Sequence, residues 1–562
     1  MRRLFGTSVA SARQSRFLLA AAVVAATLCG QGPPPPPPPP PPPALPALPV
    51  PAENPITEGK RVLGKILFWD EQLSHDDTVA CGTCHRSEFG GIDPRTAVSP
   101  GADGVFGTFD DLLGSIGVVR SNSARNYEPS PVFGLFAQVT GRYAPSFDSA
   151  AYSPTLFWDG RAGGTVLDPD TGLVAIASGG ALEAQSLGPI LNDAEMAHVG
   201  RTFAQATTKL AAAKPLKLAT NLPADVAAVL AADPSYPDLF SAAFGDPAIT
   251  AVRIAFAIAT YERTLYPNQT PFDAWAAGNP TALTPNQLAG FGDFNGPGRC
   301  NQCHTGVTFT DNAFHNLGIR PIAQDNGRQG VTGLLADRGK FKTPSLRNAV
   351  LRPNYLHTGD LPSIPVVLNF YNGDGGPNLD NKDPLLLGLN INAAQRARIA
   401  DFLNALVDPR TVAGTFPFDR PTLYGETHPL NGNLYGQATV GTGNRFPAMF
   451  GISPAAIGAD FRIGLANAIG NSPAVMGVAG LSLVPSVSVG GFLLNIDPST
   501  ALLLFETTTG GAGAGGGFAT SHFSIPNDPA FAGFPFVAQW FIADPAAPGG
   551  ISASQGASFL TF

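Results

Sequence analysis

Apolar residues recur at intervals of three and four along two stretches of the chain, which is the spacing of one face of an α-helix. The apolar positions are Ile254, Ile258, Tyr261 and Leu265 in 251–265, and Ile399, Phe402, Leu403 and Leu406 in 393–406. Elsewhere between about 56 and 408 the chain has short helical patterns joined by long connections rich in Gly, Pro, Asn and Asp, without regular strand alternation. We therefore expect this region to be mainly α-helical.

Beyond about residue 411 the pattern changes to short apolar runs separated by Gly and Pro, and lysine is absent. LSLVPSVSV at 481–489 and ALLLFETTT at 501–509 are typical of these runs. Such spacing predicts antiparallel strands. We expect an all-β, sandwich-like module over 411–562, in which the glycine cluster 510–517 forms a flexible loop. We find no candidate chemistry in this module.

The N-terminus has the pattern of an export signal. Four arginines precede an uncharged apolar run at 17–28, which rises about 18 Å as a helix, short of the roughly 30 Å of a bilayer core. This predicts a secretory signal over 1–30 rather than a membrane span. Lipoprotein signals usually have a small residue before the lipidated cysteine, whereas Cys29 follows Leu28. We therefore expect export, and a lipid tether through Cys29 is the alternative. The prolines at 33–43 predict a stiff spacer within a linker over 31–55.

Composition narrows the possible functions. Charged residues make up only 14% of the chain, and the net charge is −8. Phosphate contacts need clustered Lys and Arg, so a nucleic-acid partner is not expected. Four of the five cysteines occur in two identical patterns, which leaves no set of cysteines for a disulfide scaffold.

Those two patterns have the form C-x-x-C-H, at Cys81-Gly-Thr-Cys84-His85 and Cys300-Asn-Gln-Cys303-His304. Two thiols at this spacing reach the two vinyl groups of one porphyrin, and the adjacent histidine is placed as the proximal iron ligand. The alternatives are a zinc site or redox-active disulfides. Two copies in an exported chain favour covalent attachment of two c-type haems.

A count of ligand types limits the sixth iron ligands. After His85 the next histidine is His198, so we expect the first haem to have an open position, and we interpret His75, ten residues earlier, as a solvated loop residue. No methionine lies between His304 and residue 448. The candidates for the second haem are His315, Tyr355, His357 and Tyr371.

With these motifs the sequence resembles the bacterial dihaem cytochrome c peroxidase and MauG family, over roughly residues 56–408. The resemblance rests on segments distributed along this region. They are LGKILFWDEQLS, LFWDGR (156–161), GPILNDAEM (188–196), FTDNAFHNLG (309–318), FKTPSLRN (341–348) and FYNGDGG (370–376). It implies a peroxidatic haem domain over 56–250, an electron-transfer haem domain over 251–410, and a β-rich module of unknown role over 411–562.

The resemblance also implies roles for individual residues. Glu195 corresponds to the family's distal acid–base glutamate, and Pro189 and Gln185 lie at the family's distal-pocket spacing from it. Trp158 corresponds to the Trp between the two haems. Tyr371, fourteen residues after His357, falls where ordinary cytochrome c peroxidases carry a Met ligand and MauG carries a Tyr.

Each of these residues also has a purely structural interpretation. Asn192-x-x-Glu195 has the form of a helix N-cap with its capping-box partner, Trp158 is by default a buried aromatic, and Tyr371 is by default a half-buried hydrogen-bonding residue. A 17-residue insertion at 164–180 separates LFWDGR from the segment with Gln185, and this is a departure from the family's pattern close to Trp158.

The family's Ca²⁺ between the haems is a further implied cofactor. The corresponding positions here are Tyr143, Arg352 and Asn354. An Arg at a cation site is electrostatically unfavourable, and Asn126 is the one alternative donor we find nearby. The sequence leaves Ca²⁺ open.

We interpret the chain as an exported dihaem peroxidase of the MauG-like type. Its expected partners are hydrogen peroxide and a protein electron donor, which is a small cytochrome c, a copper protein or a partner with an oxidisable Trp or Tyr. Two alternatives remain: a dihaem oxygenase that uses O₂, similar to rubber oxygenases, and a non-enzymatic dihaem electron carrier.

Overall fold

The computed structural model of the protein describes residues 45–562, apart from residues 96, 102, 109–110 and 429–432. The predicted signal peptide, Cys29 and the proline run lie outside the described residues. The last part of the predicted linker is not a free spacer. Asn54 is fully buried, and its side-chain amide donates to Glu183 at 2.8 Å. None of the helices described is long and apolar enough to cross a membrane.

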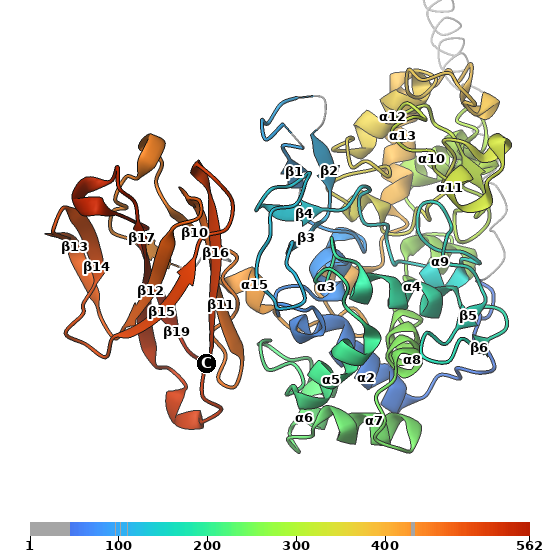
Figure 1. Ribbon diagram of the computed structural model, residues 1–562. Helices are drawn as coiled ribbons and strands as arrows, with labels where there is room; N and C mark the ends of the chain where they lie inside the picture. Colours follow the sequence, from blue (N-terminus) through green and yellow to red (C-terminus); the bar gives the residue numbers. More distant parts are fainter. Residues whose placement is uncertain (1–44, 96, 102, 109–110, 429–432) are drawn as a thin grey trace, which may run out of the picture. The chain divides into compact units, whose positions relative to one another are not determined.

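The region before residue 428 is mainly helical, as predicted (Figure 1). Its helices are α2 (Glu58–Trp69), α3 (Cys81–Cys84), α4 (Ala181–Leu191), α5 (Phe203–Ala212), α6 (Ala224–Leu230), α7 (Tyr236–Phe244), α8 (Ala251–Glu262), α9 (Pro271–Ala276), α10 (Pro285–Asn295), α11 (Gln329–Thr332), α12 (Ile364–Asn372), α13 (Ala393–Asn404), α14 (Pro409–Ala413) and α15 (Tyr424–Thr427).

Short antiparallel strand pairs also occur in this region, although the sequence showed no alternation there. They are two to four residues long, too short to leave a periodic signal. The pairs are β1 (Ala97–Ser99) with β2 (Leu112–Gly114), β3 (Ile116–Val119) with β4 (Ala137–Val139), β5 (Val166–Leu167) with β6 (Val174–Ile176), and β7 (Phe314–His315) with β8 (Phe341–Lys342).

Two separate hydrophobic clusters underlie the helical region, one for each C-x-x-C-H motif. In the first, α2 crosses α8 so closely that a Cβ on Gly64 would lie 1.9 Å from the carbonyl oxygen of Ala257. In the second, α10 crosses α13 in the same way, and a Cβ on Gly290 would lie 2.0 Å from the Arg398 carbonyl oxygen. Glycine at each crossing therefore lets a helix pair close behind each motif.

The cluster boundaries differ from the predicted domain boundaries. The first cluster includes the buried face of α8 and Leu265, so it extends beyond the predicted boundary at 250. It also includes Phe418 and Leu423. The segment after residue 411 therefore returns to the first cluster, and the strand-rich part begins only at Asn433.

The C-terminal part is built from strands, as predicted. A three-stranded sheet has the order β10-β11-β16, a larger sheet has the order β15-β12-β17-β19-β9 with β18 paired to β17, and β13 and β14 form a hairpin. All pairs are antiparallel. The strands are β9 (Asn433–Tyr435), β10 (Ala448–Phe450), β11 (Asp460–Ile469), β12 (Pro473–Ala479), β13 (Ser482–Val489), β14 (Phe492–Ile496), β15 (Leu503–Thr508), β16 (Ala514–Ser524), β17 (Pro535–Ala543), β18 (Ile551–Ala553) and β19 (Gly556–Leu560).

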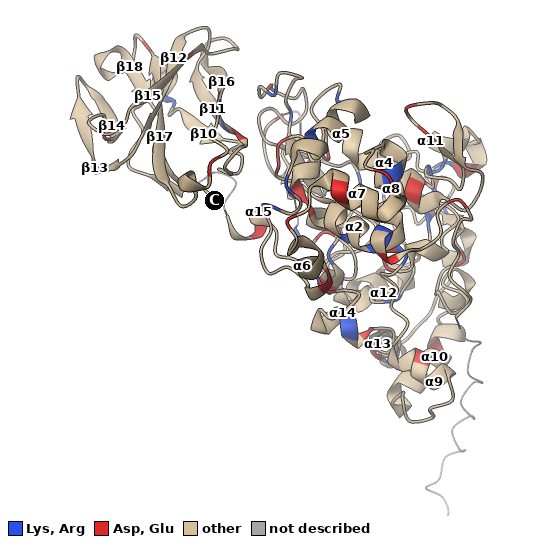
Figure 2. Ribbon diagram, turned by 90° about the horizontal axis from the view of Figure 1, so that it is seen from below, with Lys and Arg blue, Asp and Glu red and all other residues tan. Residues whose placement is uncertain are grey.

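Side chains from both sheets share one core, which includes Phe461 of β11 and Trp540 of β17. Figure 2 shows how few charged residues these strands carry. The predicted loop 510–517 is wrong over its second half, because β16 begins at Ala514. A Cβ on Gly517 would lie 2.2 Å from the Ile469 carbonyl oxygen, so glycine here permits close strand pairing rather than flexibility.

Candidate active site

A cavity of about 600 Å³ lies beside the first C-x-x-C-H motif. This volume is within the roughly 300–1,000 Å³ of typical ligand sites. The predicted residues that line it are Cys84, His85, Trp158, Gln185, Pro189 and Glu195. Cys81 lies one turn earlier in α3 and packs against the first cluster. The structure thus brings together residues that are spread over more than a hundred positions of the sequence.

His85 is prepared to act as a ligand through one nitrogen. Its Nδ1 lies 3.2 Å from the carbonyl oxygen of Gly91, which can only accept, so Nδ1 carries the proton and Nε2 is left with its lone pair. Burial lowers the pKa of His85, which keeps the imidazole neutral.

Helix α4 forms one wall of the cavity. Gln185 and Pro189 are four residues apart and therefore lie on the same helical face. Asn192 ends this helix as its C-cap, so the predicted N-cap with a capping box is wrong. The Asn192 side chain instead organises the turn that follows. Its Oδ1 accepts from the Ala194 amide at 2.9 Å, and its Nδ2 donates to Glu195 Oε1 at 3.1 Å.

The turn that carries Glu195 is fixed from two sides. The Gln138 side chain of β4 donates to the Asp193 carbonyl at 2.5 Å. On β3, a Cβ on Gly117 would lie 1.7 Å from the Ala194 carbonyl oxygen, so only glycine lets this strand approach the turn. Burial raises the pKa of Glu195, and the positive charge of Arg161 opposes that shift in part. A carboxyl with a raised pKa is suited to exchange protons near neutral pH.

The interpretation of His75 as a solvated residue is wrong. His75 is 3% exposed, its Nε2 lies 3.3 Å from Ser121 Oγ, and its backbone amide donates to the Met196 carbonyl at 2.8 Å. It is not among the residues that line the cavity. The polar sequence SHDD concealed its burial. Nε2 of the ring has a partner in Ser121, whereas Nδ1 is buried without one among the described residues.

Trp158 lines both this cavity and a second one beside the other motif. Its indole Nε1 donates to the Tyr143 carbonyl at 2.8 Å, which fixes the ring. Phe157 before it has a φ of 66°, a strained conformation for a residue with a side chain. The 17-residue insertion after this loop contains the β5–β6 hairpin and leaves Trp158 in contact with both cavities.

The second cavity has about 180 Å³ and is smaller than typical ligand sites. Its lining nevertheless has the predicted donors Cys300, Cys303, His304 and Tyr371. Nδ1 of His304 lies 3.1 Å from the Phe309 carbonyl oxygen, which leaves Nε2 with its lone pair, as in His85. Burial lowers the pKa of His304 to about 4.

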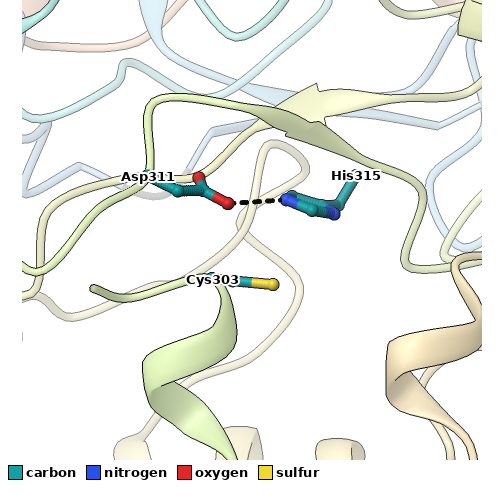
Figure 3. A group of neighbouring side chains, drawn as sticks. All are labelled: Cys303, Asp311 and His315. Carbon is teal, nitrogen blue, oxygen red and sulfur yellow. Dashed lines mark hydrogen bonds and ion pairs between the residues drawn. The ribbon is translucent and has the colours of Figure 1, made fainter.

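Two of the candidate sixth ligands already have partners. His315 lies between two carboxylates, with Nε2 2.9 Å from Asp311 and Nδ1 2.5 Å from Asp383. The carboxylate of Asp311 contributes most to raising the pKa of His315 to about 11, so the ring is a cation and not a ligand. Figure 3 shows Cys303 pointing toward the same group. The Tyr355 hydroxyl donates to the Ala349 carbonyl at 3.0 Å.

Tyr371 and His357 remain as candidates. Both line the second cavity, and Nε2 of His357 is buried without a hydrogen-bond partner among the described residues. Burial raises the pKa of Tyr371 and lowers that of His357 to about 3. The His357 ring is stacked 3.6 Å from the Phe341 ring, whereas Tyr371 projects from α12.

The predicted calcium positions do not fit a cation. The Arg352 guanidinium itself donates to backbone carbonyls, with Nε 3.3 Å from Gly90 and Nη2 3.1 Å from Ser345. The Asn354 side chain donates to the Tyr143 hydroxyl at 3.2 Å. A buried guanidinium therefore occupies one of the predicted ligand positions, and its charge repels a cation, so we assign no calcium to this position.

Sequence reasoning missed several ionisable residues that line the first cavity, among them Asp148, Glu262 and Lys342. Burial raises the pKa of Glu262 to about 8 and lowers that of Lys342 to about 8. A signal for Glu262 was present, because it lies four residues after Ile258 on the apolar face of its helix. An acid on such a face is unusual.

The donor sets of both cavities fit a c-type haem. Each has a neutral imidazole with a free Nε2 and cysteine thiols from one C-x-x-C turn, next to an apolar helix pair. In the first cavity, His85 carries the only imidazole among the lining residues, and no methionine lines it. In the second cavity, the donor set rather than the volume supports a haem site.

Comparison with known proteins places the chain near a di-haem family. Residues 58–281 match the family described as di-haem cytochrome c peroxidase. The methylamine utilization protein MauG of Methylorubrum extorquens is 31% identical over 339 residues, which are 59% of this chain and 74% of that protein. The cytochrome c551 peroxidase of Nitrosomonas europaea is 30% identical over 323 residues, 57% of this chain and 74% of that protein.

Among solved structures, a MauG-like protein associated with microbial copper homeostasis aligns with a TM-score of 0.47 and 24% identity. The alignment covers 69% of this chain and 98% of that one.

Proposed function

The chain belongs to the family of di-haem cytochrome c peroxidases and MauG proteins, and from this we propose that it reduces hydrogen peroxide in the cavity beside His85 with electrons drawn through the cavity beside His304. It is a di-haem oxidoreductase of the peroxidase type. Each bound haem supplies a redox-active iron. We propose that the four cysteines attach the haems through thioethers and that His85 and His304 are the proximal ligands.

One observation carries the proposal: the cavity beside His85 has an acid–base group but no second strong ligand. Glu195 lines the cavity, and its lining has no imidazole besides His85 and no methionine. An electron carrier would need both irons closed by protein ligands, whereas this lining leaves room for a small oxidant.

We propose that Glu195 moves one proton between the two oxygens of peroxide. Its carboxylate takes the proton from one oxygen and gives it to the other, so that this oxygen leaves as water while the O–O bond breaks. General acid–base help of this kind typically contributes about 10²–10⁴-fold. The Asn192 amide orients Glu195 through its 3.1 Å hydrogen bond, and Gln185 and Pro189 line the cavity from α4.

Trp158 is the proposed relay for electrons between the cavities. The support is its contact with both cavities and the hydrogen bond that fixes its indole to the Tyr143 carbonyl. We further propose Tyr371 as the second axial ligand in the cavity beside His304. A phenolate there would place the protein with MauG-like enzymes, whose donor is an oxidisable side chain of a partner protein, rather than with users of a small cytochrome c or copper protein.

We also propose that the protein is exported. The support is the arginine-flanked apolar run at 17–28 and the proline run that follows it. Attachment of haem to C-x-x-C-H motifs is consistent with an exported protein.

Peroxide reduction can be tested by its stoichiometry. The purified di-haem protein should consume one H₂O₂ for every two one-electron donors oxidised, since H₂O₂ + 2 H⁺ + 2 e⁻ gives two H₂O. Donor oxidation and peroxide loss are followed together, with and without dissolved O₂. A turnover that depends on O₂ instead of peroxide would contradict the proposal and support the oxygenase alternative.

A further inference from the structure

The peroxide reaction needs more protons than Glu195 can provide. Glu195 only relocates a proton that the peroxide already holds. The second oxygen atom leaves as water after it has taken up two electrons and two further protons. A group that holds a proton at neutral pH and lines the same cavity is therefore required, and this requirement rests on the proposed function.

Glu262 meets this requirement by position. It follows four residues after Ile258 on the buried face of α8, and it lines the cavity together with Gln185 and Glu195. The residue is 6% exposed. Its Oε2 lies 3.4 Å from Ser186 Oγ, which is next to Gln185 in α4. This contact ties Glu262 to α4, the helix that carries Gln185 and Pro189, although Ser186 itself does not line the cavity.

Glu262 also lacks a counterion, although one lies next to it in the sequence. The adjacent Arg263 is fully engaged by Glu183, with contacts of 2.7 and 2.9 Å to its two oxygens. In the described part of the chain no cationic nitrogen lies within ion-pair distance of Glu262. An unpaired buried carboxyl is stable only as the neutral acid, because desolvation penalises the charge.

The charges around Glu262 agree with a neutral acid. Arg263 favours the carboxylate, while the carboxylate of Glu183 opposes it, and burial outweighs both. Lys60 lies beyond this pair and interacts with Glu183 and Arg263. Burial and the charge of Glu262 together raise the pKa of the Cys81 thiol, and this sulfur is uncharged when joined to haem.

We propose that Glu262 acts beside Glu195 as a proton-carrying carboxyl of this cavity and that it supplies the protons taken up by the departing oxygen. In each step the Glu262 O–H bond breaks, its proton passes to the oxygen, and an electron from the donor protein balances the charge. The carboxylate then regains a proton from solvent. Solvent reaches the cavity at the exposed side chain of Asn192. Glu195 thus moves a proton that peroxide already holds, and Glu262 supplies the further protons.

The first test uses stability and needs no turnover. The pKa of Glu262 is about 8 in the folded protein against an ordinary value of 4.5. A carboxyl with a raised folded-state pKa contributes stability that is present below the unfolded value and is lost as pH rises through the folded value. Relative to Glu262→Gln, the wild-type Tm should therefore fall between pH 5 and pH 9. A constant Tm difference across this range would overturn the proposal.

The second test is chemical rescue. Glu262→Gln should lower steady-state peroxide turnover by about 10²-fold, and Glu262→Ala should regain rate with added formic acid in proportion to the protonated form. Glu71→Gln is the control. Glu71 is another buried acid with a pKa raised to about 8, but it accepts from the Tyr424 and Gly425 amides and does not line the cavity. The Glu71→Gln variant should change the pH dependence of stability and leave turnover unchanged.

The outcomes separate this inference from the proposed function. Wild-type turnover in Glu262→Gln, or a slow Glu262→Ala that formic acid does not rescue, overturns the role of Glu262 and leaves peroxide reduction standing. A wild-type protein that does not reduce peroxide overturns both.

Discussion

Replacing Glu195 by Gln should lower peroxide turnover by at least about 100-fold while the spectra of both haems stay as in the wild type. The amide keeps the shape of the side chain, so the Asn192 contact at 3.1 Å can be retained. It cannot take a proton from peroxide. The measurement is steady-state peroxide consumption, with absorption spectra of the ferric protein as the check on haem content.

The same role for Glu195 predicts the direction in which turnover changes with pH. Glu195 acts first as a base, so turnover should rise with pH as the carboxyl loses its proton. Burial raises the pKa of Glu195, so this rise should lie above the ordinary range of a glutamate. In Glu195→Gln the rise should be absent.

Asp193→Asn is the matched control, because it removes a negative charge two residues away on the same turn. The Asp193 side chain is half exposed and pairs with Arg120 at 3.6 Å. Its turnover should stay near the wild-type value. A Glu195→Gln protein with the wild-type rate would mean that Glu195 serves only the structure of the turn.

Tyr371→Phe should abolish the wild-type low-spin spectrum of the second haem and raise its reduction potential. A phenolate is a hard anionic donor that stabilises the ferric state, and phenylalanine offers no donor. Burial raises the pKa of the free phenol. A bound metal reverses this tendency, because its charge stabilises the deprotonated ligand. Absorption spectroscopy during a redox titration measures both changes.

His357→Gln distinguishes the two remaining ligand candidates. The His357 ring is stacked on Phe341, and its Nε2 has no partner among the described residues. If Tyr371 is the ligand, His357→Gln should keep the low-spin spectrum. The opposite pattern, in which only His357→Gln loses it, would assign the ligand to histidine.

The ligand also determines the electron donor. With Tyr371 bound, the low potential should make the unmodified protein a poor oxidant of ferrocytochrome c. Rapid oxidation of ferrocytochrome c would instead indicate an ordinary cytochrome c peroxidase.

Local patterns predicted the parts of the fold that depend on local spacing. The helices at 251–262 and 393–404 follow the periodic apolar positions, and the strands at 482–489 and 503–508 follow the short apolar runs. The pattern failed where contacts distant in sequence decide the structure. β16 begins inside the glycine cluster because those glycines permit close pairing with β11.

The residues of the C-x-x-C-H motifs were predictable because their spacing fixes the geometry. The C-x-x-C-H turns place Cys84 and His85 at one cavity and Cys300, Cys303 and His304 at the other.

The surroundings of these motifs were predictable in part. The family resemblance pointed to Trp158, Gln185, Pro189 and Glu195, which line the first cavity, whereas local patterns misled elsewhere. Polar sequence suggested that His75 is solvated, and the capping pattern misplaced Asn192, because burial and helix direction depend on packing. Glu262 was missed because its helix was interpreted only through its apolar residues.

The most direct test of the central claim is the electron paramagnetic resonance spectrum of the fully ferric protein, before and after cyanide. One open and one closed haem should give one high-spin and one low-spin signal, and cyanide should convert only the high-spin signal without prior reduction. Two low-spin signals that cyanide does not change would show a hidden ligand beside His85 and would contradict the account.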